Sequence, residues 1–532
     1  MVPVKNPENR RDFRLTHFGK TTLKLLDIIY QRRFWIAVFI VAYLLPVWVF
    51  KFFPSQDGPS HLYNAQILRE FTNPNYDFRQ YYQLHLALFP NWLANLLEWA
   101  FLYIAPALIA EKLLLTVYVI AFPLSFFYFL DAVQPGRNLT GFISFLFIFN
   151  FLLMKGLYSY ALAIPLFFFT LGYWWRHKEH LGWKEIVLCN LLMALIFLGH
   201  LVPYLLAVFS LALLALVYFR RRIRPILLTA ACILPSGILP IDYLLTSSSI
   251  GSKLTSAQFT SVWGLLQQLI SLGFLVSFNK NQQIIAQVVA VILCALLLFS
   301  LWKDVQDRRK PLARALSPRF YFLLLALVLL ILYLFAPKAI GSGTMLNERI
   351  GLLAVLVMAV SFREGQPRVW RWLAVALGAV LLVNLAWLGY TFHTLNKSLT
   401  AFVSAVPQIE TNKVILPILI GRNGPSLKVG IYEHADNYYT LDNGGINVMN
   451  YETEYDYFPV KFKADFQPPL KTPLWVEAIF SHPERVDLCG YASHIDYLLI
   501  FDTQGKFEPD SLTRCYDMIY DKNELRLFKP KQ

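Results

Sequence analysis

The chain has 532 residues, of which 56% are hydrophobic and only 15% are charged. A soluble globular protein carries nearer a quarter of charged residues, so this composition excludes an ordinary soluble domain. The formal net charge of +14 does not indicate a nucleic-acid partner, because the basic residues are spread over short segments between apolar runs. The sequence therefore predicts an integral membrane protein.

Apolar runs recur through the first 391 residues, and many approach the 20 residues needed to cross a hydrocarbon core about 30 Å thick. The first 33 residues are polar and basic, and no small-residue cleavage site follows the first run, so we interpret that run as a true span. The sequence predicts about eleven spans, at 34–53, 108–130, 139–154, 161–175, 186–199, 202–219, 225–246, 283–302, 319–336, 350–362 and 369–391.

The loop charges predict the orientation. With the N-terminus in the cytoplasm, the six inner segments hold 25 Lys/Arg against 9 Asp/Glu, whereas the tail 392–532 holds 14 against 18. Basic residues concentrate on the cytoplasmic side of membrane proteins. We therefore expect a multi-pass protein of a bacterial cytoplasmic membrane, with the first loop (54–107) and the tail outside.

The segment 89–105 is apolar enough to be confused with a further span. Counting it as one would place three basic loops on the outer side, against the charge rule. We instead predict an amphipathic helix at the outer interface, with Asn91, Asn95 and Glu98 towards its polar side.

The tail predicts a small soluble α/β domain at 392–532. Four segments have the composition of strands and are separated by Asn-Gly, Gly-Gly and Pro signals; they are 413–420, 427–433, 495–502 and 524–530. The segment 472–480 is more typical of a helix. Cys489 and Cys515 lie in this domain, where an oxidising compartment permits a disulfide, and the sequence leaves that pairing open.

The motif QDGPSH directly after the first span is the sharpest polar feature of the sequence. Gly58-Pro59 forms a turn and then a helix start, with Pro at the first helical position. Asp57 is therefore expected at the membrane surface beside a helix N-terminus, four residues before His61. A simple helix-capping role for Asp57 is the alternative.

This motif, followed by the helix PNWLANLLEW, resembles the GT-C superfamily, whose members are polytopic membrane glycosyltransferases that use polyprenyl-phosphate-linked sugars. The resemblance covers residues 1–391 and implies a GT-C-like fold. It also implies that Asp57 lies at the active site and that transfer inverts the anomeric carbon. A single Asp stands here where some members have an acidic pair.

An outer-face transferase needs a carboxylate for the acceptor hydroxyl and cations for the donor phosphate. The expected catalytic residues are Asp57 and His61, and the expected phosphate ligands are Arg349, Lys338 and Lys155. Further candidates for substrate binding are His200, Glu348, Tyr158 and Tyr160. Structural alternatives are a partnership of Glu348 and Arg349 with other spans, lysines that extend to the interface, and a structural histidine at a span end.

The sequence thus predicts a glycosyltransferase that moves a sugar from a polyprenyl phosphate to a glycan, lipid or protein acceptor, in contact with membrane lipids. We expect no cofactor and no metal, although a divalent ion stays open. Two alternatives are a secondary transporter or lipid flippase, and a non-catalytic scaffold for envelope assembly. Polar groups at mid-depth would favour transport, whereas the predicted ones cluster at the outer ends of the spans.

Overall fold

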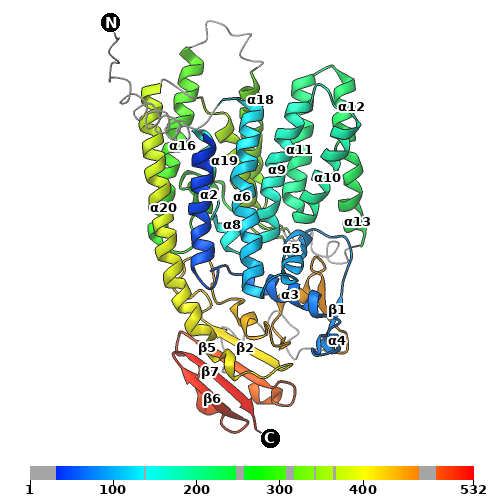
Figure 1. Ribbon diagram of the computed structural model, residues 1–532, viewed down its shortest axis with the longest axis vertical. Coiled ribbons are helices and arrows are strands. Elements are labelled where there is room, and N and C mark those ends of the chain that lie inside the picture. The colour runs from blue at the N-terminus through cyan, green and yellow to red at the C-terminus, as the bar shows by residue number, and fades with distance from the viewer. Residues whose placement is uncertain are drawn as a thin grey trace, which may run out of the picture.

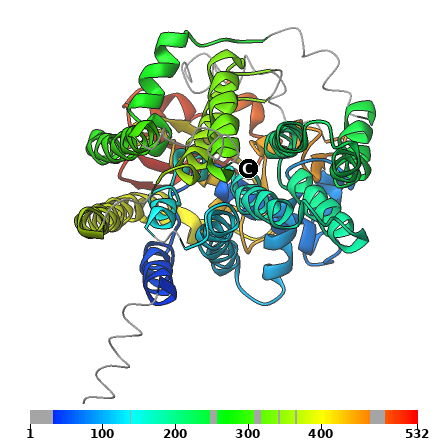
Figure 2. The same cartoon turned by 90° about the horizontal axis from the view of Figure 1, so that it is seen from above.

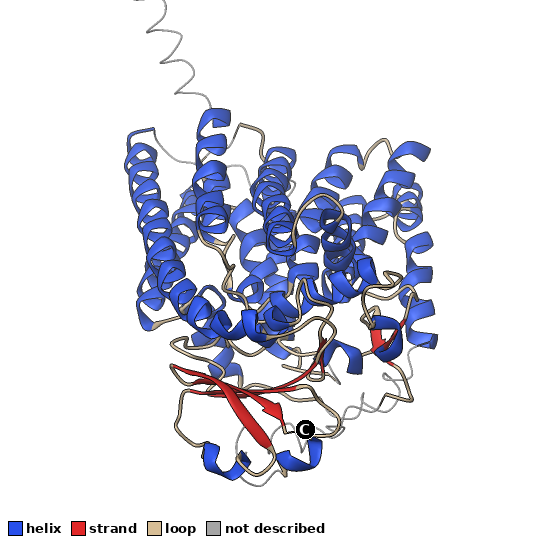
Figure 3. Cartoon of the chain, turned by 60° about the horizontal axis from the view of Figure 1, so that its bottom comes forward, coloured by secondary structure: helices blue, strands red, loops and turns tan. Residues whose placement is uncertain are grey.

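The computed structural model describes residues 32–136, 139–246, 257–306, 317–340, 343–363, 367–466 and 487–531. A large helical bundle is joined at one end to a β-sheet domain formed by the tail (Figure 1). Helix α2 (Arg32–Val49) begins at the end of the bundle away from the sheet (Figure 1). Figure 3 brings the sheet end forward and shows most of the strands gathered beneath the helices.

The bundle helices run roughly side by side and appear end-on in Figure 2. They are α2 (Arg32–Val49), α6 (Ala107–Val133), α9 (Tyr158–His177), α10 (Trp183–Gly199), α11 (Leu201–Phe219), α12 (Ile223–Ala231), α13 (Ile238–Thr246), α16 (Lys280–Gln306), α18 (Pro318–Phe335), α19 (Leu346–Val360) and α20 (Pro367–Phe402). The short helix α15 (Val262–Ile270) contacts α18 and the turn η4 (Gly273–Leu275).

Six of the described helices are long and apolar enough to cross a membrane, and a bent pair, 223–231 with 234–246, would make a seventh. The predicted count of about eleven spans is therefore not confirmed. Three of the remaining predicted spans correspond to α9, α10 and α19, of 20, 17 and 15 residues. A hydropathy pattern alone does not separate such helices from full spans.

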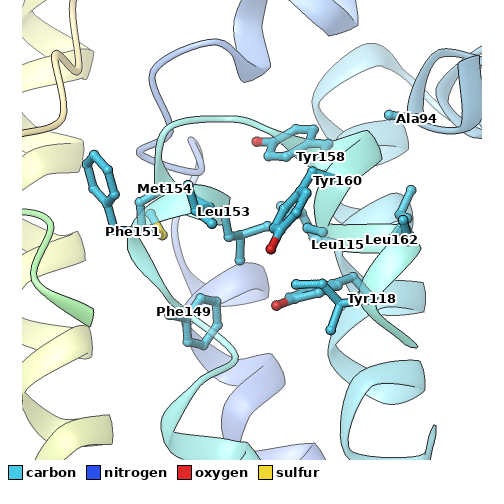
Figure 4. Packing of buried hydrophobic residues seen from close by; sticks show 14 of the residues in the cluster. Ala94, Leu115, Tyr118, Phe149, Phe151, Leu153, Met154, Tyr158, Tyr160 and Leu162 are labelled. Carbon is cyan, nitrogen blue, oxygen red and sulfur yellow. The ribbon is translucent and has the colours of Figure 1, made fainter. Parts of the chain in front are cut away.

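The predicted span 139–154 is broken into short pieces. They are η2 (Thr140–Phe142), α7 (Ile143–Leu146) and α8 (Phe151–Met154). Asn150 causes the second break, because its side-chain oxygen accepts the backbone N–H groups of Leu152 and Leu153 at 3.0 and 3.1 Å and so caps α8. The side chains of this segment pack against α6 and α9 in the apolar core, where Tyr118, Tyr158 and Tyr160 lie (Figure 4).

The first loop folds into α3 (Gly58–Glu70), α4 (Phe78–Tyr81), β1 (Tyr82–Leu84) and α5 (Trp92–Leu102). Helix α5 confirms a helix within 89–105, but the predicted direction of its polar side is wrong. Asn95 and Glu98 are buried, whereas Leu96 and Trp99 are exposed. The reason is that α5 packs its polar side against α3, α6 and α9.

The tail domain is a five-stranded sheet in the order β3-β2-β5-β7-β6. Its strands are β2 (Val414–Ile420), β3 (Ile446–Asn447), β5 (Tyr497–Asp502), β6 (Tyr516–Lys522) and β7 (Leu525–Pro530). Strands β2 and β5 pair in parallel and are entirely buried, which explains their continuous apolar sequences. Strands β5 and β7, and β6 and β7, pair antiparallel.

Three of the four predicted strands are confirmed, and the prediction for 427–433 is wrong, since that segment forms turns. The predicted helix 472–480 lies outside the described residues, so the helical part of the expected α/β domain is described only as short 3-10 turns. Cys489 and Cys515 form a disulfide. Helix α20 crosses the expected boundary at 391 without interruption and ends at Phe402.

A second, two-stranded sheet joins the first loop to the tail. Strand β1 pairs antiparallel with β4 (Val460–Phe462), with Gln83 opposite Lys461. The first loop and the tail therefore lie at the same end of the bundle, as the predicted topology requires.

Candidate active site

A cavity of about 520 Å³ lies where the first loop, the ends of four bundle helices (α9, α11, α13 and α19) and the tail domain meet. This volume is within the range of small-molecule sites. Its walls include Asp57 and His61 from the first loop, Tyr158 and Tyr160 from α9, His200 between α10 and α11, Arg349 from α19, and Tyr451, Tyr455, Tyr457 and Phe458 from the tail. The cavity thus brings together six of the nine predicted site residues.

Two glycines hold the backbone of Asp57 against its surroundings. A Cβ on Gly58 would lie 2.2 Å from the Ser55 Oγ and 2.4 Å from the Tyr158 hydroxyl. Gly156 has φ +87°, and a Cβ there would lie 2.6 Å from the Asp57 nitrogen. Because only glycine tolerates both the positive φ and this close approach, the two loops fix Asp57 at one position.

The carboxylate of Asp57 does not cap helix α3. The backbone carbonyl of Asp57 accepts from Ser60 and His61 at 3.0 and 3.1 Å, but its side chain makes no capping hydrogen bond. One carboxylate oxygen instead accepts from the Gln56 Nε2 at 3.0 Å and lies 3.7 Å from the His434 Nε2. The carboxylate therefore faces the cavity, against the capping alternative.

The surroundings of Asp57 adjust its protonation. Burial raises the pKa of Asp57 to about 6, although the positive charges of His61 and Lys155 act in the opposite direction. Burial lowers the pKa of His434 to about 3, so this neighbour is neutral near pH 7. A carboxylate with a pKa near 6 is ionised at neutral pH and is a better proton acceptor than an ordinary aspartate.

His61 is held by two acceptors. Its Nδ1 lies 2.7 Å from the Glu452 Oε1, and its Nε2 lies 3.0 Å from the carbonyl oxygen of Gly156. Two acceptors require two N–H donors, which makes His61 an imidazolium facing a carboxylate. Burial alone would lower its pKa, but the charge and hydrogen bond of Glu452 outweigh this and raise the pKa of His61 to about 9.

This pairing means that His61 acts through its charge on Asp57 and not as a proton acceptor. Both ring nitrogens are occupied, so His61 supplies positive charge beside Asp57 rather than a vacant base. The pair also connects the first loop to the tail domain through fully buried groups.

A buried polar network lies behind Asp57. The Tyr158 hydroxyl donates to the Glu111 Oε1 at 2.7 Å and lies 2.7 Å from the Ser55 Oγ. Glu98 is buried nearby, and both of its carboxylate oxygens lack a protein hydrogen-bond partner. Burial raises the pKa of Glu98 well above its usual range, which favours its neutral form. This network leaves Asp57 as the ionised acid that lines the cavity.

Arg349 provides a buried cation on the opposite wall. Its Nη1 lies 2.5 Å from the His200 Nε2, while the His200 Nδ1 accepts the backbone N–H of Val202 at 3.0 Å. A neutral imidazole has a single acceptor nitrogen, so it cannot satisfy both donors. Burial lowers the pKa of His200 well below its usual range, and the charge of Arg349 adds to this. The guanidinium therefore has a neutral and incompletely matched partner, and its Nε has no hydrogen-bond partner.

The remaining predicted residues take other positions. Lys155 does not line the cavity but donates to the Gln56 Oε1, one residue from Asp57. The Lys338 side chain is exposed and does not line the cavity. Glu348 accepts from the Gln268 Nε2 of α15 at 3.0 Å and does not line the cavity. Phosphate binding by Lys155 and Lys338 stays a prediction.

Several residues of the site were not singled out by the sequence. His434, Tyr451 and Glu452 belong to a stretch that is rich in Tyr, Asn, His and Asp. The partner of His434 is Asp57 and that of Glu452 is His61, and both partners lie almost 400 positions away in the sequence. Glu98 and Glu111 fall in apolar segments, where an isolated acid is the one signal of a functional position. Among the described residues, no group of three or more His, Cys, Asp or Glu side chains is arranged to hold a metal ion.

No protein-family profile matches the sequence. No curated protein matches it either. The crystal structure of ArnT from Cupriavidus metallidurans in the apo state is similar to this chain, with a TM-score of 0.51 and 11% sequence identity. The similarity covers 96% of this chain and 98% of that chain, so it includes the tail domain as well as the bundle. It supports the GT-C-like fold that the sequence motif implies.

Proposed function

We propose that this protein is a membrane glycosyltransferase that moves a sugar from a polyprenyl-phosphate carrier to an acceptor on the outer face of the cytoplasmic membrane. The observation that carries this proposal is that one cavity holds both the Asp57 carboxylate and the Arg349 guanidinium. The carboxylate makes no helix-capping hydrogen bond, and the hydrogen-bond partner of the buried guanidinium is a histidine. ArnT, which has a similar fold, is a GT-C glycosyltransferase.

The chemistry follows from these two charges. Asp57 takes the proton of the acceptor hydroxyl while that oxygen forms a bond to the anomeric carbon. The bond between the anomeric carbon and the phosphate oxygen breaks, and the carrier phosphate leaves with the electron pair. Arg349 holds that anion through its planar N–H donors. A single displacement of this kind inverts the anomeric carbon.

The burial of the two charges is what makes them effective. A buried charge is costly unless it is paired, and the Arg349 guanidinium touches a neutral histidine rather than an acid. A carrier phosphate would remove this cost and is therefore bound in preference to a neutral lipid. The cavity lies at the ends of the helices beside the tail domain, which suits a lipid-linked donor better than a path through the bundle.

A deletion strain tests the proposal. Loss of the protein should cause a polyprenyl-phosphate-linked sugar to accumulate, and extracted lipids analysed by mass spectrometry would reveal its mass. Wild-type protein should restore the normal lipid pool, whereas Asp57→Asn should not. An unchanged pool of lipid-linked sugars in the deletion strain would overturn the proposal and favour the transporter or scaffold alternatives.

A further inference from the structure

Four aromatic residues of the tail domain form one wall of the cavity. We name Tyr451, Tyr455, Tyr457 and Phe458 the aromatic rib. All four line the cavity, and they follow one another from the 3-10 turn η7 (Tyr451–Glu454) towards β4. Phe458 is buried, whereas the three tyrosines are half-buried. The rib therefore presents partly accessible ring surfaces to the same space as Asp57 and Arg349.

The rings support one another. Tyr455 and Tyr457 are stacked with centroids 5.2 Å apart and planes 27° apart. Tyr451 meets Tyr455 edge-on at 6.3 Å and Phe458 edge-on at 6.0 Å. The His434 ring stacks on Tyr451 at 4.3 Å. Packed rings of this kind lose little conformational freedom when a ligand binds, because their positions are already fixed.

The rib extends between the two charges of the site. At one end, Tyr451 stacks on His434, whose Nε2 lies 3.7 Å from the Asp57 carboxylate. At the other end, Tyr457 lies within electrostatic range of Arg349. In a single displacement, the reacting carbon lies between the acceptor oxygen, beside the base, and the phosphate, beside the cation. A sugar ring that contains this carbon must lie along the wall that joins them.

We propose that the aromatic rib binds the transferred sugar, a pyranose or furanose ring whose C–H face packs against the ring surfaces that Tyr455 and Tyr457 leave open to the cavity. This inference rests on the proposed function and deepens it by assigning the sugar subsite. The faces of aromatic rings carry negative potential, and the polarised C–H groups of a sugar are attracted to them. The rib provides these faces, while Asp57 and Arg349 provide the two charged ends.

The experiment compares two probes on the full-length protein in lipid nanodiscs. The probes are decaprenyl phosphate alone and decaprenyl phosphate carrying a neutral hexose or pentose. Wild-type protein should bind the best sugar-bearing probe more tightly than decaprenyl phosphate alone. Tyr455→Leu removes the π-face, keeps an apolar side chain, and should weaken binding of the sugar-bearing probe about 10-fold without changing binding of the bare phosphate.

Tyr455→Phe is the matched variant, since it keeps the ring face and should retain near wild-type affinity for the sugar-bearing probe. Tyr103→Leu makes the same change at an exposed tyrosine outside the cavity and should alter neither affinity. The thermal unfolding midpoint of each variant checks that it is folded. If Tyr455→Leu misfolds, Tyr457→Leu replaces it in the same comparison.

The possible results separate the rib from the proposed function. If Tyr455→Leu lowered the affinity for both probes equally, or lowered neither, the rib assignment would be overturned while the transferase proposal would stand. If wild-type protein bound neither probe, the proposed function would fail. In that case saturation-transfer NMR with methyl glycosides tests whether the rib binds sugar. Saturation transfer to the sugar C–H protons that disappears in Tyr455→Leu would support the rib assignment, and absence of transfer in wild type would overturn it.

Discussion

The two ends of the helical bundle use charge in opposite ways. At the end away from the sheet, basic residues meet acids: Arg32 contacts Asp131 at 2.5 Å, and Arg319 and Arg363 both contact Asp304 at 3.0 and 2.9 Å. In the cavity beside the tail domain, Arg349 contacts a neutral histidine and the Asp57 carboxylate lies 3.7 Å from the neutral His434, although His61 and Glu452 form a buried pair at the same end.

This difference distinguishes charges that stabilise the structure from charges that act in the proposed reaction. A charge that is already neutralised orients the chain and contributes modestly to stability. A buried charge without a matching partner raises the free energy of the empty site, and a ligand of opposite charge or a reacting proton relieves that cost. Substitutions at the sheet-side end should therefore act on activity, and those at the other end on stability.

The largest effect is expected for Asp57→Asn. Asn has nearly the same shape as Asp, and the Asp57 side chain makes no capping hydrogen bond, so folding should be retained while the charge is lost. Transfer should fall by a factor on the order of 10² or more if Asp57 is the base. The rate of sugar transfer to acceptor, measured on purified protein, checks this.

Asp442→Asn is the matched control, because Asp442 is exposed and distant from the cavity. It should leave transfer unchanged. Wild-type activity in Asp57→Asn would remove the catalytic assignment and leave the comparison of the two ends without its main support.

Arg349→Ala should lower kcat/KM about 10- to 100-fold, because it removes charge-assisted hydrogen bonds to the carrier phosphate. Arg349→Lys should restore only part of this, since the ammonium lacks the planar fork. Titration with decaprenyl phosphate measures the binding component.

Arg222→Ala provides the contrast at the other end, where Arg222 pairs with Glu179 at the surface. The affinity of the Arg222→Ala protein for decaprenyl phosphate should equal that of wild type. Equal losses in Arg349→Ala and Arg222→Ala would mean that the two ends do not differ in the way inferred here.

The pH profile of transfer should be bell-shaped. The pKa of Asp57 is raised to about 6, so activity should rise as pH passes through about 6 and the carboxylate ionises. The pKa of His61 is raised to about 9, so the His61–Glu452 pair is present below that pH and is lost as pH rises through it. Activity and thermal stability should both decline on the alkaline side.

Glu452→Gln sharpens this prediction. Without the carboxylate, the strongest influences that raise the pKa of His61 are lost while burial still lowers it, so the alkaline limb should move to lower pH. Glu410→Gln, which removes a surface pair with Lys529, should leave the limb in place. An alkaline limb that is the same in Glu452→Gln and wild type would exclude His61 as its origin.

The smallest effect is expected for Arg32→Gln. Its pair with Asp131 is partly solvated, with side chains 27% and 23% exposed. Such pairs contribute about 1 kcal/mol or less and weaken in salt. Thermal unfolding at low and high salt should show a small difference that shrinks as salt rises, with unchanged transfer activity.

The parts of the site that the sequence predicts are those fixed by local signals. Gly58-Pro59 places Asp57 beside a helix start, and the resemblance to the GT-C superfamily implies its place at the active site. Arg349 was selected as a basic residue at an outer span end, where the orientation of the spans does not require one. Both line the cavity. Neither inference needed knowledge of distant contacts.

The missed parts depend on packing between distant segments. His61 was expected as a catalytic group, but its role is set by Glu452, 391 positions away. Glu98 was expected at a polar surface, because an amphipathic pattern does not say which side of the helix meets protein. The number of spans stays unconfirmed, because buried and spanning helices share the same apolar composition.

The contact between His61 and Glu452 has a consequence for the time course of synthesis. The first loop with Asp57 and His61 is made early, and Glu452, the partner of His61, is made 391 positions after His61. At about 5–20 residues per second, that interval is roughly 20–80 s. During it, a nascent chain carries the acid without its aromatic wall or fixed imidazolium. Under the proposed function, transfer would therefore require the tail domain, and a protein truncated before Tyr451 would be inactive.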